Sequence, residues 1–225
     1  MDTVIGTLRW IHIGAGLLAL GVAPGAMLTA KGGRAHRRWG KIYFWLMAVV
    51  AATAVVLGLW RPVTFLVLVA VFSFYSAFTG YRVLSRKRPD HGDRAQTLDW
   101  AAALLTLGAS ATLIVLGLFP PGPAWAPRAS VAVVFGAIGV VLAARDIRQF
   151  VRPPAEPLHW WFHHMTGMLT SYIAAVTAFS VVNFAFLPTT VRWLWPTLIG
   201  TLLITAWVRY YRIRFARRRP TAAGV

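Results

Sequence analysis

The chain is built almost entirely of apolar runs of about 20 residues that are separated by short basic or proline-rich connections. A helix of that length crosses the roughly 30 Å hydrocarbon core of a bilayer, where every backbone polar group must be bonded within the chain. We therefore predict an all-α fold, a polytopic transmembrane helical bundle that forms a single domain over residues 1–225. The seven predicted spans are residues 4–29, 39–60, 62–83, 97–119, 128–147, 158–186 and 190–209.

Composition supports this class and excludes others. Apolar residues make up 58% of the chain and charged residues 13%, whereas a soluble domain carries about 25% charged residues. The net charge of +17 is not the footprint of a nucleic-acid-binding module, because the basic residues form short clusters between apolar runs. The absence of cysteine excludes disulfides, thiolate ligands and a cysteine nucleophile.

The basic residues also predict an orientation. Seven spans place nineteen of the 23 Lys and Arg residues on one side of the membrane. The positive-inside rule then predicts an outside N-terminus and a cytoplasmic C-terminus in a bacterial inner membrane. Residues 128–147 form the weakest span, but without it the charge bias disappears. We expect the basic clusters to contact the anionic headgroups of the bilayer. We expect no nucleic acid as a partner, and the sequence leaves open whether the protein forms a homo-oligomer.

Histidines are concentrated in the stretch "LHWWFHHMTG", residues 158–167, which contains His159, His163 and His164. At helical spacing His159 and His163 point the same way, and His164 is rotated by about 100°. His36 lies at the corresponding entry to the second span. The pattern predicts several imidazole groups at one depth, near the cytoplasmic surface.

Two carboxylates are predicted at the same depth, because Asp99 starts the fourth span and Asp146 ends the fifth. Imidazole and carboxylate groups together suit a first-row transition metal such as Fe, Zn or Cu. In a variant of this hypothesis the carboxylates orient the imidazoles instead of binding the metal. The predicted metal-ligand set is His36, His159, His163, His164, Asp99 and Asp146.

Haem b is the alternative cofactor, and it needs axial ligands from two helices at one depth. His36 paired with His163 or His164 meets that condition. His12 lies nearer the outer surface, and its depth differs from that of His163 and His164 by more than ~10 Å. The predicted cofactor-binding residues are therefore His36, His163 and His164, and the favoured function is a metal- or haem-binding, redox-active bundle.

Two other functions remain open. Histidine and tryptophan are common at membrane interfaces, which fits a structural or lipid-interacting protein without a cofactor. His12, inside the first span, begins a stripe of small residues and is expected to face neighbouring helices, near Tyr172 or Asn183. Such a buried polar group also fits a carrier of protons or small solutes.

Two stretches carry a resemblance to a known family: "HIGAGLLALGVAPGAMLTAKGGRAHRRWGKIY" (His12 to Tyr43) and "ARDIRQFVRPPAEPLHWWFHHMTGMLTSYIAAVTAFSVVN" (Ala144 to Asn183). They resemble bacterial predicted membrane proteins of the "domain of unknown function 2306" type. That family has no assigned reaction, so the resemblance implies only which positions matter. These are His12, His36, Asp146, His164, Tyr172 and Asn183.

Overall fold

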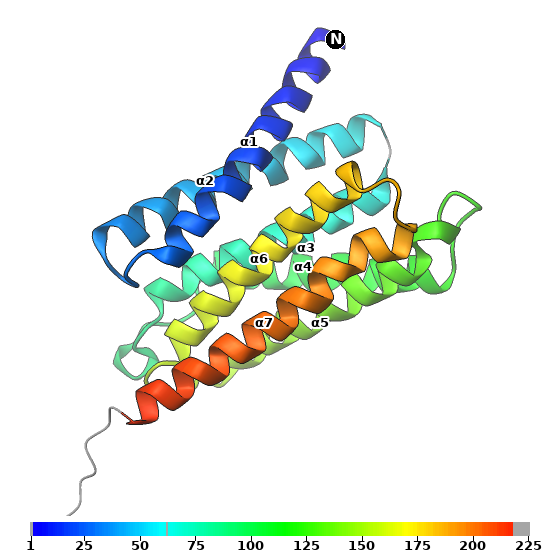
Figure 1. Cartoon of the computed structure of the whole chain (residues 1–225). Coiled ribbons are helices and arrows are strands. Elements are labelled where there is room, and N and C mark those ends of the chain that lie inside the picture. Colours follow the sequence, from blue (N-terminus) through cyan, green and yellow to red (C-terminus); the bar gives the residue numbers. More distant parts are fainter. Residues whose placement is uncertain (1, 62, 218–225) are drawn as a thin grey trace, which may run out of the picture.

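Seven long α-helices form the protein in a computed structural model, which describes residues 2–61 and 63–217 (Figure 1). Each is long and apolar enough to cross a membrane, so the prediction of an all-α, multi-pass bundle of seven spans is confirmed. The helices are α1 (Asp2–Leu28), α2 (Arg34–Trp60), α3 (Thr64–Arg82), α4 (Thr97–Leu118), α5 (Ala129–Val151), α6 (His159–Asn183) and α7 (Thr189–Arg217). Short 3-10 turns are η1 (Val83–Ser85), η2 (Pro89–His91) and η3 (Ala126–Arg128).

Two helices extend well beyond their predicted spans. α2 begins at Arg34 instead of residue 39, and α7 continues to Arg217 instead of ending at 209. Hydropathy detects only the apolar part of a helix, whereas arginine is a good helix former and continues the backbone hydrogen bonding. At 1.5 Å per residue the 29 residues of α7 measure about 43 Å, which is longer than the hydrocarbon core.

The helices pack in an order that places α3 and α6 at the centre. α1 packs on α2 to one side, α4 on α5 to the other, and α7 lies along α6 (Figure 1). Successive helices run in opposite directions, so three connections and the end of α7 lie at the same end of the bundle. We call it the basic end, because it carries the basic residues of segments 31–41, 82–94, 145–152 and 209–217. Arg218 and Arg219, two of the nineteen basic residues that are predicted on this side, lie outside the described residues.

The central pair, α3 and α6, is in backbone contact through two glycines. A Cβ atom on Gly80 would lie 3.0 Å from the amide nitrogen of Met168, and one on Gly167 would lie 2.8 Å from the Cα atom of Gly80. Small residues at a helix crossing allow this close approach, which is a main source of packing energy in lipid. The crossing is one helical turn from His163 and His164, and it fixes where their rings lie.

Candidate functional site

His36 and His164 each bond the last turn of a neighbouring helix. The Nδ1 atom of His36 lies 2.9 Å from the carbonyl oxygen of Ala26 in α1, and that of His164 lies 2.7 Å from the carbonyl oxygen of Gly80 in α3. Carbonyls in the last turn of a helix lack helical partners and are available to side chains. The two helix ends therefore orient both rings.

These bonds determine the tautomer of both rings. A carbonyl oxygen only accepts, so Nδ1 of each ring carries the proton and donates it. In the neutral form Nε2 of His36 and Nε2 of His164 are then unprotonated and keep their lone pairs. The ring centroids are 6.1 Å apart and the ring planes are inclined by 81°. Two imidazoles with available Nε2 atoms thus stand side by side.

Both rings line a cavity of about 630 Å³ at the basic end, bounded by α1, α2, α3, α6 and α7. Its walls are largely aromatic and aliphatic, and include Trp160, Trp161 and Trp207. Ligand cavities in proteins typically measure about 300–1,000 Å³ and combine apolar walls with a few polar groups. This cavity has both properties.

The cavity also has basic side chains and no acidic ones among its described lining residues. Besides Arg82, these basic residues are Lys31, Arg37, Lys41 and Lys87. The ammonium group of Lys31 donates to the carbonyl of Met27 and lies 5.7 Å from the ring centroid of Trp207. Lys87 lies 4.7 Å from the ring centroid of Trp160. Desolvation by partial burial lowers the pKa of Lys31.

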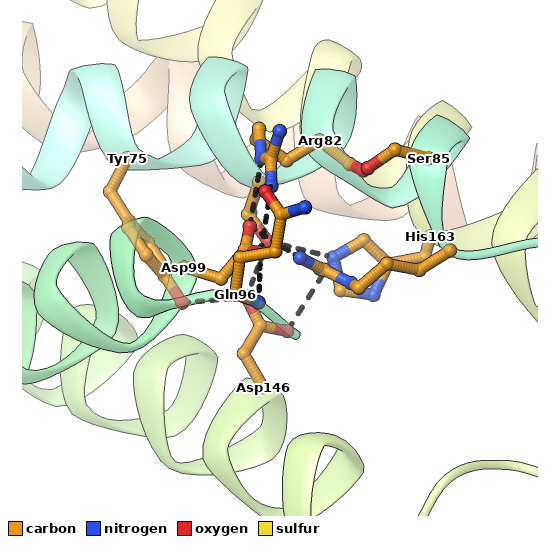
Figure 2. A network of polar contacts seen from close by, with 9 residues as sticks. Tyr75, Arg82, Ser85, Gln96, Asp99, Asp146 and His163 are labelled. Atoms are coloured by element: carbon orange, nitrogen blue, oxygen red, sulfur yellow. Dashed lines mark hydrogen bonds and ion pairs between the residues drawn. The ribbon is translucent and has the colours of Figure 1, made fainter. Parts of the chain in front are cut away.

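A second polar cluster lies in the bundle interior (Figure 2). Asp146 of α5 accepts hydrogen bonds from the hydroxyls of Tyr75 and Thr79, both at 2.7 Å. Nε2 of His163 lies 3.1 Å from Thr79 Oγ1 and 3.5 Å from Asp146 Oδ1. Three helices, α3, α5 and α6, are joined by this cluster.

The hydrogen-bond directions follow from the proton on Thr79. Its hydroxyl donates to Asp146, so its oxygen accepts from His163 and the proton of that ring lies on Nε2. Nδ1 of His163 is buried and has no partner among the described residues. The proton of the neutral His163 ring therefore lies on Nε2, whereas that of His164 lies on Nδ1. The protonated Nε2 of His163 faces the carboxylate of Asp146.

Asp99 belongs to an arginine cluster at the start of α4. Arg82 forms two parallel bonds to its carboxylate, 3.0 Å from Nε and 2.9 Å from Nη2, and also donates to Gln96 at 2.8 Å. Arg86 contacts the same carboxylate through Nη1 as an ion pair. Asp99 also accepts from the backbone N–H of Gln96, which completes a capping box at the start of α4.

The two clusters contain equal numbers of arginines and aspartates, and the contacts of both arginines are to Asp99. Arg82 and Arg86 supply two positive charges, and Asp99 and Asp146 supply two negative charges. Both carboxylates are almost fully buried, with 2% and 3% exposure. A buried charge without partners is costly, and Asp146 is stabilised by two hydroxyl donors and by the nearby imidazole of His163.

The other candidate residues lie apart from the cavity histidines. His159 bonds the carbonyl of Glu156 in the preceding connection. His12 faces a neighbouring helix, as predicted, but its partners are Val50 and Thr53 of α2 at 3.1 and 2.9 Å. The expected proximity to Tyr172 or Asn183 is wrong. Tyr172 bonds the carbonyl of Leu20 in α1, and Asn183 bonds that of Phe179 within α6.

The six predicted metal ligands are thus divided among separate environments. His36 and His164 line the cavity, His163 and Asp146 share the interior cluster, Asp99 binds arginines, and His159 lies in a loop contact. Among residues 2–61 and 63–217 no group of three or more histidine and acidic side chains is placed to hold a metal ion. The orienting role expected of Asp146 toward an imidazole agrees with its contact to His163, whereas Asp99 orients guanidinium groups.

Sequence reasoning missed four members of the interior clusters. Tyr75, Thr79, Arg82 and Arg86 recur at spacings of four, three and four, which places them on one stripe of the third span and its continuation. A polar stripe of this kind inside an apolar segment is the signal that identifies them. Two carboxylates predicted at the same depth are the natural partners of such a stripe.

Comparison with known proteins adds no assignment: no protein-family model, curated protein or solved structure matches the chain.

Proposed function

We propose that this protein is a haem-binding, redox-active membrane protein in which His36 and His164 would hold one haem b. The observation that carries the proposal is the pair of histidines that line one cavity, each with its Nδ1 bonded to a helix-end carbonyl, which leaves Nε2 as the nitrogen that could bind a metal. Histidines that bind metals commonly donate their second ring nitrogen to a backbone carbonyl, which fixes the tautomer and the ring orientation.

The spacing of the two rings supports a shared metal ion. An imidazole nitrogen binds a metal at about 2.0–2.1 Å, and the ring centroid lies roughly 1.1 Å further out. Two imidazoles that held one ion would therefore have centroids up to about 6.3 Å apart. The centroids of His36 and His164 are 6.1 Å apart.

The donor set favours haem over a bare ion. A bare zinc site takes four ligands, at least three of them from the protein, and the described residues provide only two histidines here. A porphyrin supplies four nitrogens itself and needs two axial ligands. The cavity of about 630 Å³ and its tryptophan walls suit a flat aromatic macrocycle.

A haem iron bound by two imidazoles supplies one-electron transfer. Side chains of this chain would hold the group, and the apolar walls would limit the access of water. The proposed reaction class is therefore electron transfer.

The proposed setting is the cytoplasmic side of a bacterial inner membrane, with the N-terminus outside and the C-terminus inside. Concentration of basic residues at one end of the bundle supports that orientation through the positive-inside rule. The same residues would contact anionic lipid headgroups. A reporter fused after Val225 is expected to be active only in the cytoplasm, and periplasmic activity would contradict the orientation.

Gently purified protein tests the cofactor. We expect an absorption spectrum with a Soret band and about one haem per chain, with His36→Ala and His164→Ala each losing most of it. His159→Ala and His12→Ala are matched controls that retain the band, because neither residue lines the cavity. A colourless, metal-free and monodisperse preparation would reject the proposal in favour of a structural or lipid-interacting protein.

A further inference from the structure

The charges around the cavity identify which end of a ligand they would hold. Lys31, Arg37, Lys41 and Lys87 line it, and no aspartate or glutamate is among its described lining residues. The apolar lining includes Met165, Met168 and Leu169 of α6. A ligand that fits both regions has an anionic edge and an apolar body.

Two of the cations are already ordered. Lys31 is held by carbonyls at the end of α1 and by the ring of Trp207, and Lys87 lies over the ring of Trp160. A lysine ordered before binding loses less conformational entropy when it meets an anion. Lys31 follows α1, whereas Lys87 follows α3 and η1, so they approach the cavity from different elements.

We propose that the cavity selects a tetrapyrrole with two free carboxylates and holds both at its basic side, with Lys31 and Lys87 as principal partners. This inference rests on the proposed function and adds the direction of the ligand and the side chains that would hold its carboxylates. The carboxylate edge faces the basic end of the bundle, and the apolar edge faces the bilayer interior. Carboxylate–ammonium hydrogen bonds are charge-assisted and are stronger than neutral ones.

The test compares two ligands that differ only in these carboxylates. Cofactor-free protein in zwitterionic detergent is titrated with iron protoporphyrin IX and with its dimethyl ester, and binding is followed by the Soret band. We expect both to give the same bis-histidine spectrum, with the ester binding about ten-fold or more weakly. Equal dissociation constants would overturn the inference and leave the proposed function standing, whereas binding of neither ligand would refute both.

Charge-removing variants locate the carboxylates. Lys31→Gln and Lys87→Gln are each expected to weaken binding of the diacid several-fold and to leave binding of the ester unchanged. Arg34→Gln and Arg38→Gln are matched controls, since both arginines are exposed near the same connection but do not line the cavity. Equal losses in the lysine variants and the arginine controls would show general surface electrostatics and would overturn the assignment.

Discussion

Gly167 packs so tightly on Gly80 that a Cβ atom on Gly167 would lie 2.8 Å from the Cα atom of its neighbour. The same segment of α3 supplies the carbonyl that orients His164 and the hydroxyl that bonds His163. One helix crossing therefore sets the positions of both rings. Changes at this crossing are expected to affect the cavity as well as stability.

Gly167→Ala is predicted to destabilise the bundle by about 1–3 kcal/mol, because an added methyl group overpacks a backbone contact. It should also weaken haem binding by displacing His164. The control is Gly108→Ala in α4, where an added Cβ meets open space and alanine is the better helix former. Thermal unfolding in detergent checks both variants, and an unchanged midpoint for Gly167→Ala would contradict the account of the crossing.

Asp146→Asn is predicted to be among the most damaging single changes in the interior. It removes the buried carboxylate that accepts from the hydroxyls of Tyr75 and Thr79 and lies 3.5 Å from Nε2 of His163. Three buried groups lose a charged partner, so we expect a loss of about 3–5 kcal/mol. Tyr75→Phe removes one hydrogen bond to the same carboxylate and should cost about 1–3 kcal/mol. Denaturation of both variants gives the comparison, and a smaller loss for Asp146→Asn than for Tyr75→Phe would refute the central role of this carboxylate in the cluster.

Arg82→Lys tests the geometry of the arginine cluster at constant charge. A lysine cannot make the two parallel bonds to Asp99 and also reach Gln96, so we expect a loss of about 1–2 kcal/mol. Arg88→Lys, at an exposed position in the connection that follows α3, should be neutral. The free energies of unfolding decide the question, and equal effects of the two changes would argue against a role for the planar guanidinium.

His12→Ala separates the cofactor proposal from the carrier alternative. Loss of the bonds to Val50 and Thr53 should cost about 1 kcal/mol and leave the haem spectrum unchanged, because His12 does not line the cavity. Proteoliposome measurements provide the second readout. A proton or solute flux that depends on His12, in protein without haem, would favour the carrier.

The sequence predicts the architecture well because the bilayer constrains it strongly. Span length, backbone satisfaction and charge bias together require seven helices, including the weak fifth one, and α5 is present from Ala129 to Val151. Helix ends are predicted less accurately. α2 begins at Arg34 and α7 ends at Arg217, and both ends lie in basic stretches that hydropathy leaves outside the spans. Depth, set by position along each helix, correctly grouped His36 with His164.

Rotation about the helix axis explains most of what the sequence left undetermined. His163 and His164 are adjacent, yet a rotation of about 100° turns one toward Asp146 and the other into the cavity. Which helix each face meets depends on packing, and the contact between Gly80 and Gly167 decides it. Asp99 contacts arginines instead of histidines because the end of α3, with Arg82 and Arg86, meets the start of α4.

The most direct measurement of the central claim is electron paramagnetic resonance of the oxidised, purified protein. Two imidazole ligands are expected to give a low-spin ferric signal. His36→Ala and His164→Ala should each convert any retained haem to a high-spin form, while His163→Ala, which removes a ring bonded to Thr79, should keep the low-spin signal. Absence of haem from the protein, or a low-spin signal that survives in both the His36→Ala and the His164→Ala variant, would contradict the account.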